Sequence, residues 1–450
     1  MKKEILNCLV AKSERKRNWF VMPGHKGRDV GGYWSQLNLS ADTTETYDTD
    51  NLNNPVDMIK RSQERAAEIF GAKKTFYTIN GTSGAMIAAV TACTLPGDKI
   101  LVSRNCHVCV YRAAAIRRLE LEYILPEVVD TVDRNVTPEE VEKRIIETDP
   151  KLVIVTNPTF FGYTTDIQAI VDICNKHGVL LIVDEAHGPH FPFSDNLPLS
   201  AVQAGADIVV HSTHKTLLGL TSANMIHVCS NRVDTEELMR CITTYQTTSP
   251  NYLITLSNEL SAAFMSEGGK EVLEDNIKWA KAAADEINKI PGLSCLTDPC
   301  KDPLKIIVDT SSLVNGREFA KYLFDEKDMD SEMCDEMHID FYAGIGNIES
   351  DYIELVQALR EAASEIEPQP VKQHPPKIQI PEVQLDICDA LDADFYLEDV
   401  DDAVGKVSVD YIMPYPPGIP LILPGEVITE DSIKFFDKDK IKIFKKSPFF

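Results

Sequence analysis

Five short apolar runs, separated mostly by helix-like stretches, constrain the fold of this chain more than any other feature of its sequence. The runs occupy residues 99–103, 152–156, 179–183, 207–211 and 224–228. They are rich in β-branched residues and do not alternate strictly, which is typical of strands buried on both faces. Strands that alternate with helices favour a mainly parallel sheet with helices on both sides. We therefore predict an α/β fold for the larger part of the chain.

The pattern of elements divides the chain into five parts. Residues 1–50 form an N-terminal arm with few periodic apolar stretches, and residues 51–265 form the large domain. A long amphipathic stretch ended by Pro291-Gly292 belongs to a smaller α+β domain over residues 266–366. Prolines make residues 367–381 a semi-rigid linker, and residues 382–450 form a C-terminal α+β domain.

Composition excludes several classes of protein. The chain carries 45 Lys and Arg against 70 Asp and Glu, and a formal charge of −25 argues against a nucleic-acid partner. A hydrophobic content of 44% excludes a disordered chain. Residues 1–20 lack the apolar core of a secretory signal, and no run approaches the ~20 apolar residues of a membrane span, so we expect no membrane partner. Eleven cysteines, an odd number, indicate reduced thiols and a cytoplasmic protein.

The segment Ser212-Thr213-His214-Lys215-Thr216 follows one of the predicted strands. Lys215 would then lie at the carboxyl edge of a parallel sheet, where ligands of open α/β sheets bind. A lysine forms a Schiff base only when its amine is neutral, and a buried site favours the neutral amine. An isolated lysine in a loop is more simply a solvated side chain, so the interpretation depends on the neighbouring segments.

A second segment, Asp184-Glu185-Ala186-His187-Gly188, follows the run that ends at Val183. A carboxylate at the end of a buried strand is costly without a partner, and a pyridinium nitrogen would be one. Asp184 precedes Lys215 by about one βαβ step, so the two would end neighbouring strands. The simpler alternatives are a helix cap for Asp184 and a hydrogen-bonded core histidine for His187.

Two further segments have compatible chemistry. Gly81-Thr82-Ser83-Gly84 lies between a predicted strand and a predicted helix, where backbone amides and hydroxyls suit a phosphate, although any capped helix start looks similar. His107 follows another strand and could stack on a planar ring. One alternative is a structural histidine, and another is that Cys106, His107 and Cys109 bind zinc or form a redox pair. The sequence has no second paired-cysteine motif, so we predict no metal.

Together these segments supply phosphate-binding amides, a stacking ring, a carboxylate and a lysine on successive strand ends. A pyridoxal 5'-phosphate (PLP) site of the aspartate-aminotransferase fold type requires this set of groups. The chain also resembles, over nearly its whole length, the PLP-dependent ornithine/lysine/arginine decarboxylase family. The phrases that carry the resemblance are Met22-Pro23-Gly24-His25-Lys26-Gly27, Asn80-Gly81-Thr82-Ser83-Gly84, Asp184-Glu185-Ala186-His187-Gly188, Ser212-Thr213-His214-Lys215-Thr216, Thr248-Ser249-Pro250 and Tyr415-Pro416-Pro417-Gly418-Ile419-Pro420 with Pro424-Gly425-Glu426. The first and the last are specific to this family.

The resemblance implies a PLP-dependent transferase-like large domain and a role for each site residue. Lys215 binds the cofactor as a Schiff base, and Asp184 pairs with the pyridine nitrogen, which makes the ring an electron sink. His107 and Ala186 pack on its two faces, and His187 lies near the ring hydroxyl or the substrate carboxylate. The phosphate is bound by Gly81, Thr82, Ser83, Ser212 and His214. Ser249 reaches the phosphate of the neighbouring subunit, which implies a homodimer or a dimer of dimers with shared sites and makes the Pro-Gly-His-Lys arm an interface element.

The same resemblance implies decarboxylation of a basic L-amino acid to the corresponding amine and CO2, feeding polyamine synthesis. We favour arginine as the substrate, then lysine, then ornithine. The distal cation of such a substrate needs an acidic partner, for which Glu332, Asp335 and Glu426 are candidates in a chain rich in surface carboxylates. Candidates for the donor of a proton to the substrate Cα are His187, His214 and Lys215.

Two features depart from the family pattern. Relatives continue the stacking histidine with Lys-Ser, whereas this chain has Val108-Cys109, which changes contacts beside the ring but leaves stacking intact. The long inducible members carry an extra N-terminal domain, so this chain resembles the short form. The alternatives are an aminotransferase or aldolase on the same fold, and a regulatory homologue without turnover. The presence of both Lys215 and Asp184 argues against the latter.

Overall fold

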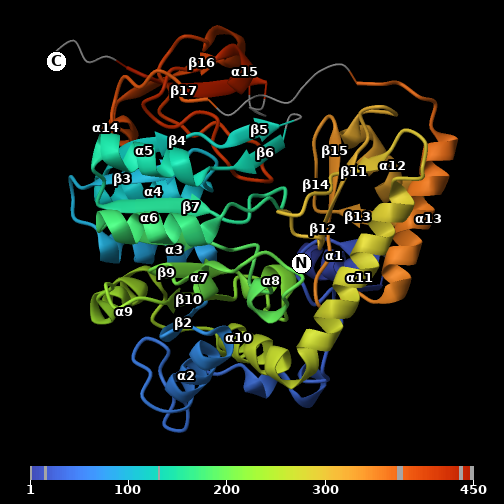
Figure 1. Cartoon of the computed structure of the whole chain (residues 1–450), viewed down its shortest axis with the longest axis horizontal. Helices are drawn as coiled ribbons and strands as arrows, with labels where there is room; N and C mark the ends of the chain where they lie inside the picture. Colours follow the sequence, from blue (N-terminus) through green and yellow to red (C-terminus); the bar gives the residue numbers. More distant parts are fainter. Residues whose placement is uncertain (1–2, 15–17, 130–131, 372–378, 435–438, 446–450) are drawn as a thin grey trace.

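A seven-stranded sheet forms the centre of the largest unit (Figure 1). The computed structural model describes residues 3–14, 18–129, 132–371, 379–434 and 439–445. In the order β2-β10-β9-β8-β7-β3-β4, neighbours from β9 to β4 are parallel, and β10 is antiparallel to both β9 and β2. The predicted mainly parallel sheet is confirmed. The strands are β2 (Lys74–Thr78), β3 (Lys99–Ser103), β4 (Glu120–Ile124), β7 (Leu152–Thr156), β8 (Leu180–Asp184), β9 (Ile208–His211) and β10 (Asn224–Val228).

Helices cover both faces of this sheet (Figure 1). Ile182 of β8 lies in the core on one face of the sheet, and its neighbour Val183 lies in the core on the other face. Both residues are fully buried, which explains why the strands are continuous apolar runs. The helices on the Ile182 face are α3 (Gly81–Cys93), α4 (Val108–Arg117) and α9 (Thr235–Tyr245). The helices on the Val183 face are α5 (Pro138–Thr148), α6 (Ile167–His177) and α7 (Ala201–Ala204).

The helix after β2 begins earlier than the sequence indicated. Gly81 to Gly84, expected to form a turn before the helix, are the first residues of α3. Gly81 has a φ of 68°, a left-handed conformation that glycine adopts without strain and that turns the chain sharply out of β2. The other elements of this unit are α2 (Met58–Phe70), the hairpin of β5 (Glu127–Val129) and β6 (Val132–Asn135), α8 (Thr213–Thr216) and α10 (Tyr252–Phe264).

A smaller antiparallel sheet, in the order β11-β12-β15-β14, forms a second unit beside the first (Figure 1). One of its faces packs on helices, with Ile306 and Phe341 in that core. The other face carries Lys305 and Tyr342, which are paired across β12 and β15. The elements are α11 (Lys270–Ile287), β11 (Ser294–Cys295), β12 (Lys305–Asp309), α12 (Gly316–Glu326), β13 (Met329–Ser331), β14 (Met333–Cys334), β15 (His338–Tyr342) and α13 (Glu349–Glu365).

The N-terminal arm has more regular structure than the sequence indicated. It contains α1 (Glu4–Glu14) and β1 (Asn18–Phe20), and β1 pairs in parallel with β13 of the small unit. Phe20 is fully buried, and its ring meets the edges of Phe341 at 6.0 Å and Tyr352 at 5.5 Å. The arm is therefore attached to the core of the small unit by a strand too short to have a recognisable apolar period.

The C-terminal unit lies against the end of the large sheet (Figure 1). Its antiparallel pair is β16 (Phe395–Asp399) and β17 (Lys440–Phe444), with the short helices α14 (Ile387–Asp392) and α15 (Glu430–Ile433), and α14 packs on α4. Residues 372–378 of the predicted linker lie outside the described residues, and the five domain boundaries stay predictions. Within the described part of the chain, no helix is long and apolar enough to cross a membrane.

Candidate active site

The carboxyl ends of β2, β3, β7, β8 and β9 meet at one edge of the large sheet, since β10 reverses direction between β9 and β2. A pocket of about 450 Å³ opens there. It is the position at which ligands of open α/β sheets bind. Ten of the eleven residues selected from the sequence line it: Gly81, Thr82, Ser83, His107, Asp184, Ala186, His187, Ser212, His214 and Lys215.

Lys215 lies on α8, just after β9, and lines the pocket. Its Nζ lies 2.6 Å from Nε2 of His187, within hydrogen-bond distance. Desolvation lowers the pKa of Lys215 below its ordinary value, and the charges of Asp184 and Glu332 oppose that shift. The lowered pKa makes the neutral, nucleophilic amine accessible nearer to neutral pH.

Asp184 is the last residue of β8 and is 4% exposed. Its Oδ1 accepts a hydrogen bond of 3.1 Å from the Ala186 amide. Burial raises the pKa of Asp184, while Lys215 and this amide oppose the rise. As predicted from the sequence, it ends a strand directly beside the strand that leads to Lys215. A buried carboxylate facing a pocket is most stable when a cation occupies that pocket.

The amino terminus of α3 lies at the pocket, which Gly81, Thr82 and Ser83 line. Thr82 Oγ1 and Ser212 Oγ share a hydrogen bond between α3 and the start of α8, and the Asn80 side chain does not cap the helix. The first amides of α3 thus lack a cap from Asn80, and uncapped amides at the start of a helix suit an anion. His214 donates a hydrogen bond from Nδ1 to the Ala223 carbonyl at 2.9 Å, and burial lowers its pKa to about 4.

His107 caps the amino terminus of α4, where its Nδ1 accepts a hydrogen bond of 3.3 Å from the Cys109 amide. Burial, with the charge of Lys215, lowers its pKa to about 4, so the ring is uncharged. The Cys106 and Cys109 thiols are fully buried, and burial raises the pKa of Cys106 to about 12. Since the redox chemistry of a thiol proceeds through the thiolate, this environment argues against a redox pair of these cysteines. Among the residues that the structure describes, no three metal-binding side chains converge.

His187 is 7% exposed and occupies the wall of the pocket nearest the small unit. Its ring packs edge-on against Phe160 at 5.5 Å and Tyr342 at 5.6 Å. Its Nδ1 is buried and has no hydrogen-bond partner in the described part of the chain. A buried nitrogen without a partner beside a pocket fits a polar group of a bound molecule. Phe160 and Tyr342 could not be selected from the sequence, because neither belongs to a polar motif.

Ser249 is the one selected residue that does not line the pocket. It is exposed, and its amide donates to Thr247 Oγ1 at 3.2 Å. Its proposed contact with a neighbouring subunit stays a prediction.

Of the three carboxylates considered for a substrate cation, only Glu332 lines the pocket. Its Oε2 accepts a hydrogen bond of 2.8 Å from the Met22 amide, so the arm also contributes to the site. Asp335 instead accepts from the Met337 and His338 amides, and Glu426 pairs with the buried Arg104. The interpretation of Asp335 and Glu426 as pocket residues is therefore wrong, because both satisfy internal donors.

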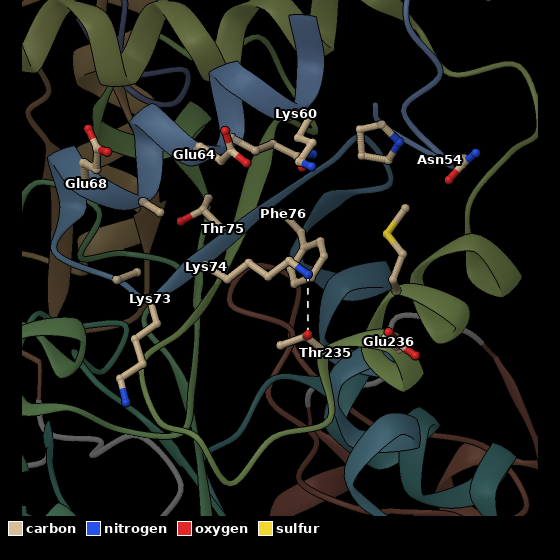
Figure 2. A pocket seen from close by; sticks show the side chains of 15 residues that line it. Asn54, Lys60, Glu64, Glu68, Lys73, Lys74, Thr75, Phe76, Thr235 and Glu236 are labelled. Carbon is tan, nitrogen blue, oxygen red and sulfur yellow. Dashed lines mark hydrogen bonds between the residues drawn. The ribbon is translucent and has the colours of Figure 1, made fainter. Parts of the chain in front are cut away.

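A second hollow lies between α2, the edge strand β2 and α9 (Figure 2). Its charged side chains are lysines and glutamates of the surface, among them Lys60, Glu64 and Lys73. Lys74 points across it toward Thr235 (Figure 2), with 3.4 Å between Nζ and Oγ1. None of the residues selected from the sequence lines this hollow.

Comparison with known sequences identifies the family. A sequence profile described as Orn/Lys/Arg decarboxylase, major domain, matches residues 5–347, and the profile of the C-terminal domain of the same enzymes matches residues 392–448. The chain belongs to the ornithine/lysine/arginine decarboxylase family. It is therefore an enzyme of the amino-acid decarboxylase class, and the resemblance inferred from its motifs is confirmed.

Two decarboxylases of this family are similar along most of the chain. The arginine decarboxylase of Bacillus subtilis is 33% identical over 93% of this chain and 90% of the relative, and that of Bacillus anthracis is 33% identical over 97% and 92%. The crystal structure of the Francisella novicida lysine decarboxylase has the same fold, with a TM-score of 0.77 at 20% identity over 97% of this chain and 80% of the other. An alanine–glyoxylate aminotransferase from Nostoc shares the fold over 69% of this chain, with a TM-score of 0.56 at 15% identity.

The uncharged state of His107 predicts how stability depends on pH. In the folded protein its pKa is about 4, whereas in the unfolded chain it is near 6.5, so the unfolded chain binds the proton first as the pH falls. Stability is therefore lost below about pH 6.5. Between pH 6 and pH 5, we expect the free energy of unfolding of the cofactor-free His107→Asn variant to fall by about 1 kcal/mol less than that of the unsubstituted protein. Urea unfolding at both pH values measures this difference, and equal losses would contradict it.

Proposed function

We propose that this decarboxylase removes the carboxylate of L-arginine as CO2 with pyridoxal 5'-phosphate as cofactor. The arrangement of Lys215, Asp184 and the α3 amino terminus around one pocket is the observation that carries the proposal. Bound PLP supplies a cationic conjugated ring that accepts the electron pair left when the bond to the carboxylate breaks. The family assignment argues against the alternative that the chain is an aminotransferase or an aldolase. The product of arginine decarboxylation, agmatine, would feed polyamine synthesis.

The described residues fit that cofactor. The buried Asp184 would pair with the protonated ring nitrogen and keep the proton there, because burial without a cation is costly for a carboxylate. The amides of Thr82 and Ser83, with the Gly81 turn and the Ser212 hydroxyl, would bind the phosphate. His214 would join them, since a nearby dianion favours the protonated imidazole.

The remaining residues would orient the ring and move protons. His107 and Ala186 line the pocket and would pack against the ring faces. Lys215 would be the covalent attachment point, since its amine has a lowered pKa. His187 lies within a hydrogen bond of that amine, so either group could return the proton to the substrate Cα.

Lys215 and the substrate are tested together. We expect the PLP-loaded protein to release CO2 from arginine faster than from lysine, and faster from lysine than from ornithine. Lys215→Ala should abolish both the release and the visible absorbance of the bound cofactor. Carbon dioxide assays with identification of the amine measure the first, and absorption spectra the second. A 2-oxo acid product would favour the aminotransferase, and a band without any product would favour a regulatory homologue.

Glu332 is the proposed partner of the distal cation. A carboxylate offers about four acceptor positions, so the Met22 amide leaves room for a guanidinium. We expect Glu332→Gln to raise KM for arginine about tenfold or more, because a charge-assisted hydrogen bond is worth about 1.5–3 kcal/mol. Glu336→Gln is the matched control, since Glu336 pairs with Arg317 and does not line the pocket. An unchanged KM in Glu332→Gln would exclude this role.

A homodimer, or a dimer of dimers, with shared sites is proposed from the family resemblance and the exposure of Ser249. Separately purified Lys215→Ala and Ser249→Glu proteins should both be nearly inactive, the second because its carboxylate repels the phosphate. Co-expression should restore about a quarter of wild-type activity, because half of the dimers are mixed and each has one intact site. No recovery would mean that Ser249 acts within its own subunit, and an active Ser249→Glu protein would mean that Ser249 has no role at the phosphate.

A cytoplasmic location is proposed on the state of the cysteines. All eleven are described and none forms a disulfide. Free thiols persist in reducing compartments. Fractionation of cells that express the full chain, followed by immunodetection, measures the location directly, and recovery outside the cytoplasmic fraction would contradict it.

A further inference from the structure

Arg104 is a fully buried arginine that the proposed reaction does not use. It directly follows β3, and its side chain is 0% exposed. Its guanidinium donates from Nη1 to the Pro420 carbonyl at 2.7 Å, and from Nη2 to the Leu421 carbonyl at 3.2 Å and to Glu426 Oε2 at 3.0 Å. All three acceptors belong to the C-terminal unit, more than 300 residues away in the sequence.

The surroundings of Arg104 stabilise it as a cation in this position. The guanidinium lies 5.5 Å from the ring centres of Tyr111 and Tyr123, whose faces attract a cation. Glu426 is 2% exposed, and its Oε2 also accepts from the Leu423 amide at 2.7 Å. Buried ion pairs add little net stability compared with apolar side chains of the same size, but they fix the geometry of the groups that satisfy them. We therefore look for the role of this ion pair in the position that it gives to the C-terminal segment, and not in the stability that it adds.

The segment that Arg104 binds continues directly into the pocket. Tyr415, Pro416, Pro417 and Ile419 line it, and we refer to residues 415–419 as the strap. Arg104 binds the residues just after the strap, and the strap itself is bound to the large unit, because the Gly418 carbonyl accepts a hydrogen bond of 3.0 Å from the Val108 amide. Arg104 and Val108 lie on either side of His107 in the sequence, so the two attachments bracket that residue.

Gly418 lies directly against the imidazole of His107. A Cβ atom at this position would come within 3.0 Å of Cδ2 and Nε2 of His107, closer than a carbon contact normally allows. Gly418 also has a φ of 79°, a backbone conformation that residues with a side chain rarely adopt. A strap displaced by even a small distance would therefore leave the far side of the His107 ring without a contact.

We propose that Arg104, with Glu426, is a positioning residue that holds the strap over the pocket and thereby fixes the plane of the His107 ring. The inference rests on the proposed function, since it gives His107 the role of the ring that packs on the cofactor. Arg104 itself touches neither substrate nor cofactor. Its loss frees the strap, opens the pocket to water and lets the His107 ring rotate.

The test uses the full-length, PLP-loaded protein. Arg104→Lys keeps the charge but not the forked donors, and Glu426→Gln keeps the shape but not the charge. We expect both to raise KM for arginine about tenfold while cofactor stays bound, and to change the visible circular dichroism of the bound cofactor, which reports the asymmetry around its ring. A purely structural role would lower the urea midpoint and leave KM and the dichroism of the folded protein unchanged, and that result would overturn the proposal.

Arg118→Met is the matched control. Arg118 also joins the large unit to the C-terminal unit, through Asp389 at 3.7 Å and Asp392 at 2.9 Å, but it is exposed and remote from the pocket lining. We expect its KM and its dichroism to equal those of the unsubstituted protein. If Arg118→Met changes them as much as the Arg104 and Glu426 variants do, attachment of the C-terminal unit in general is responsible and the proposal is wrong.

A further variant keeps the proposal testable if the Arg104 and Glu426 variants fail to fold. Gly418→Ala leaves the ion pair intact and inserts a methyl group against His107. The same rise in KM and the same change in dichroism are expected from it, and unaltered values would overturn the proposal. The dichroism needs only bound PLP. It therefore still tests the strap if arginine is not a substrate, in which case the unsubstituted protein itself would release no CO2.

Discussion

Desolvation of charged groups at one edge of the sheet is the constraint on which the site depends. Asp184 ends β8, and Lys215 lies on α8 just after the neighbouring strand β9. Burial raises the pKa of Asp184 and lowers the pKa of Lys215, while their mutual attraction opposes both shifts. The same burial keeps His107 and His214 uncharged. This balance of charge is compatible with the cofactor that we propose, which carries a cationic ring and an anionic phosphate.

Two ion pairs with buried carboxylates connect the units that enclose this edge. Arg104 and Glu426 join the large sheet to the C-terminal unit, and Arg28 of the arm forms a forked ion pair with Asp351 of the small unit at 2.6 and 2.8 Å. Each pair has a carboxylate that is at most 3% exposed. Because a buried charge without its partner is strongly unfavourable, such pairs allow few relative placements of the units. The pocket is thus bounded by three parts of the chain that are distant in sequence.

Much of the fold could be predicted because local and global preferences agree. The run 152–156 is apolar at consecutive positions since both faces of β7 are covered, and the structure reproduces its limits without change. The strand 224–228 was equally recognisable, but its antiparallel direction was not, because direction depends on the connection and leaves no mark on composition. β1 was missed for another reason: three residues are too few to show a period.

The sequence by itself placed Lys215, Asp184 and His107 just after three of the five apolar runs, and the Gly81 segment between a predicted strand and a predicted helix. It also determined the family, through polar motifs that no core position requires. Only the tertiary structure decided which carboxylate reaches the pocket. Glu332, Asp335 and Glu426 are equivalent in the sequence, but only Glu332 lines the pocket, while Asp335 and Glu426 satisfy internal donors. The partner of a buried charge is set by contacts between distant segments, and local sequence carries no record of them.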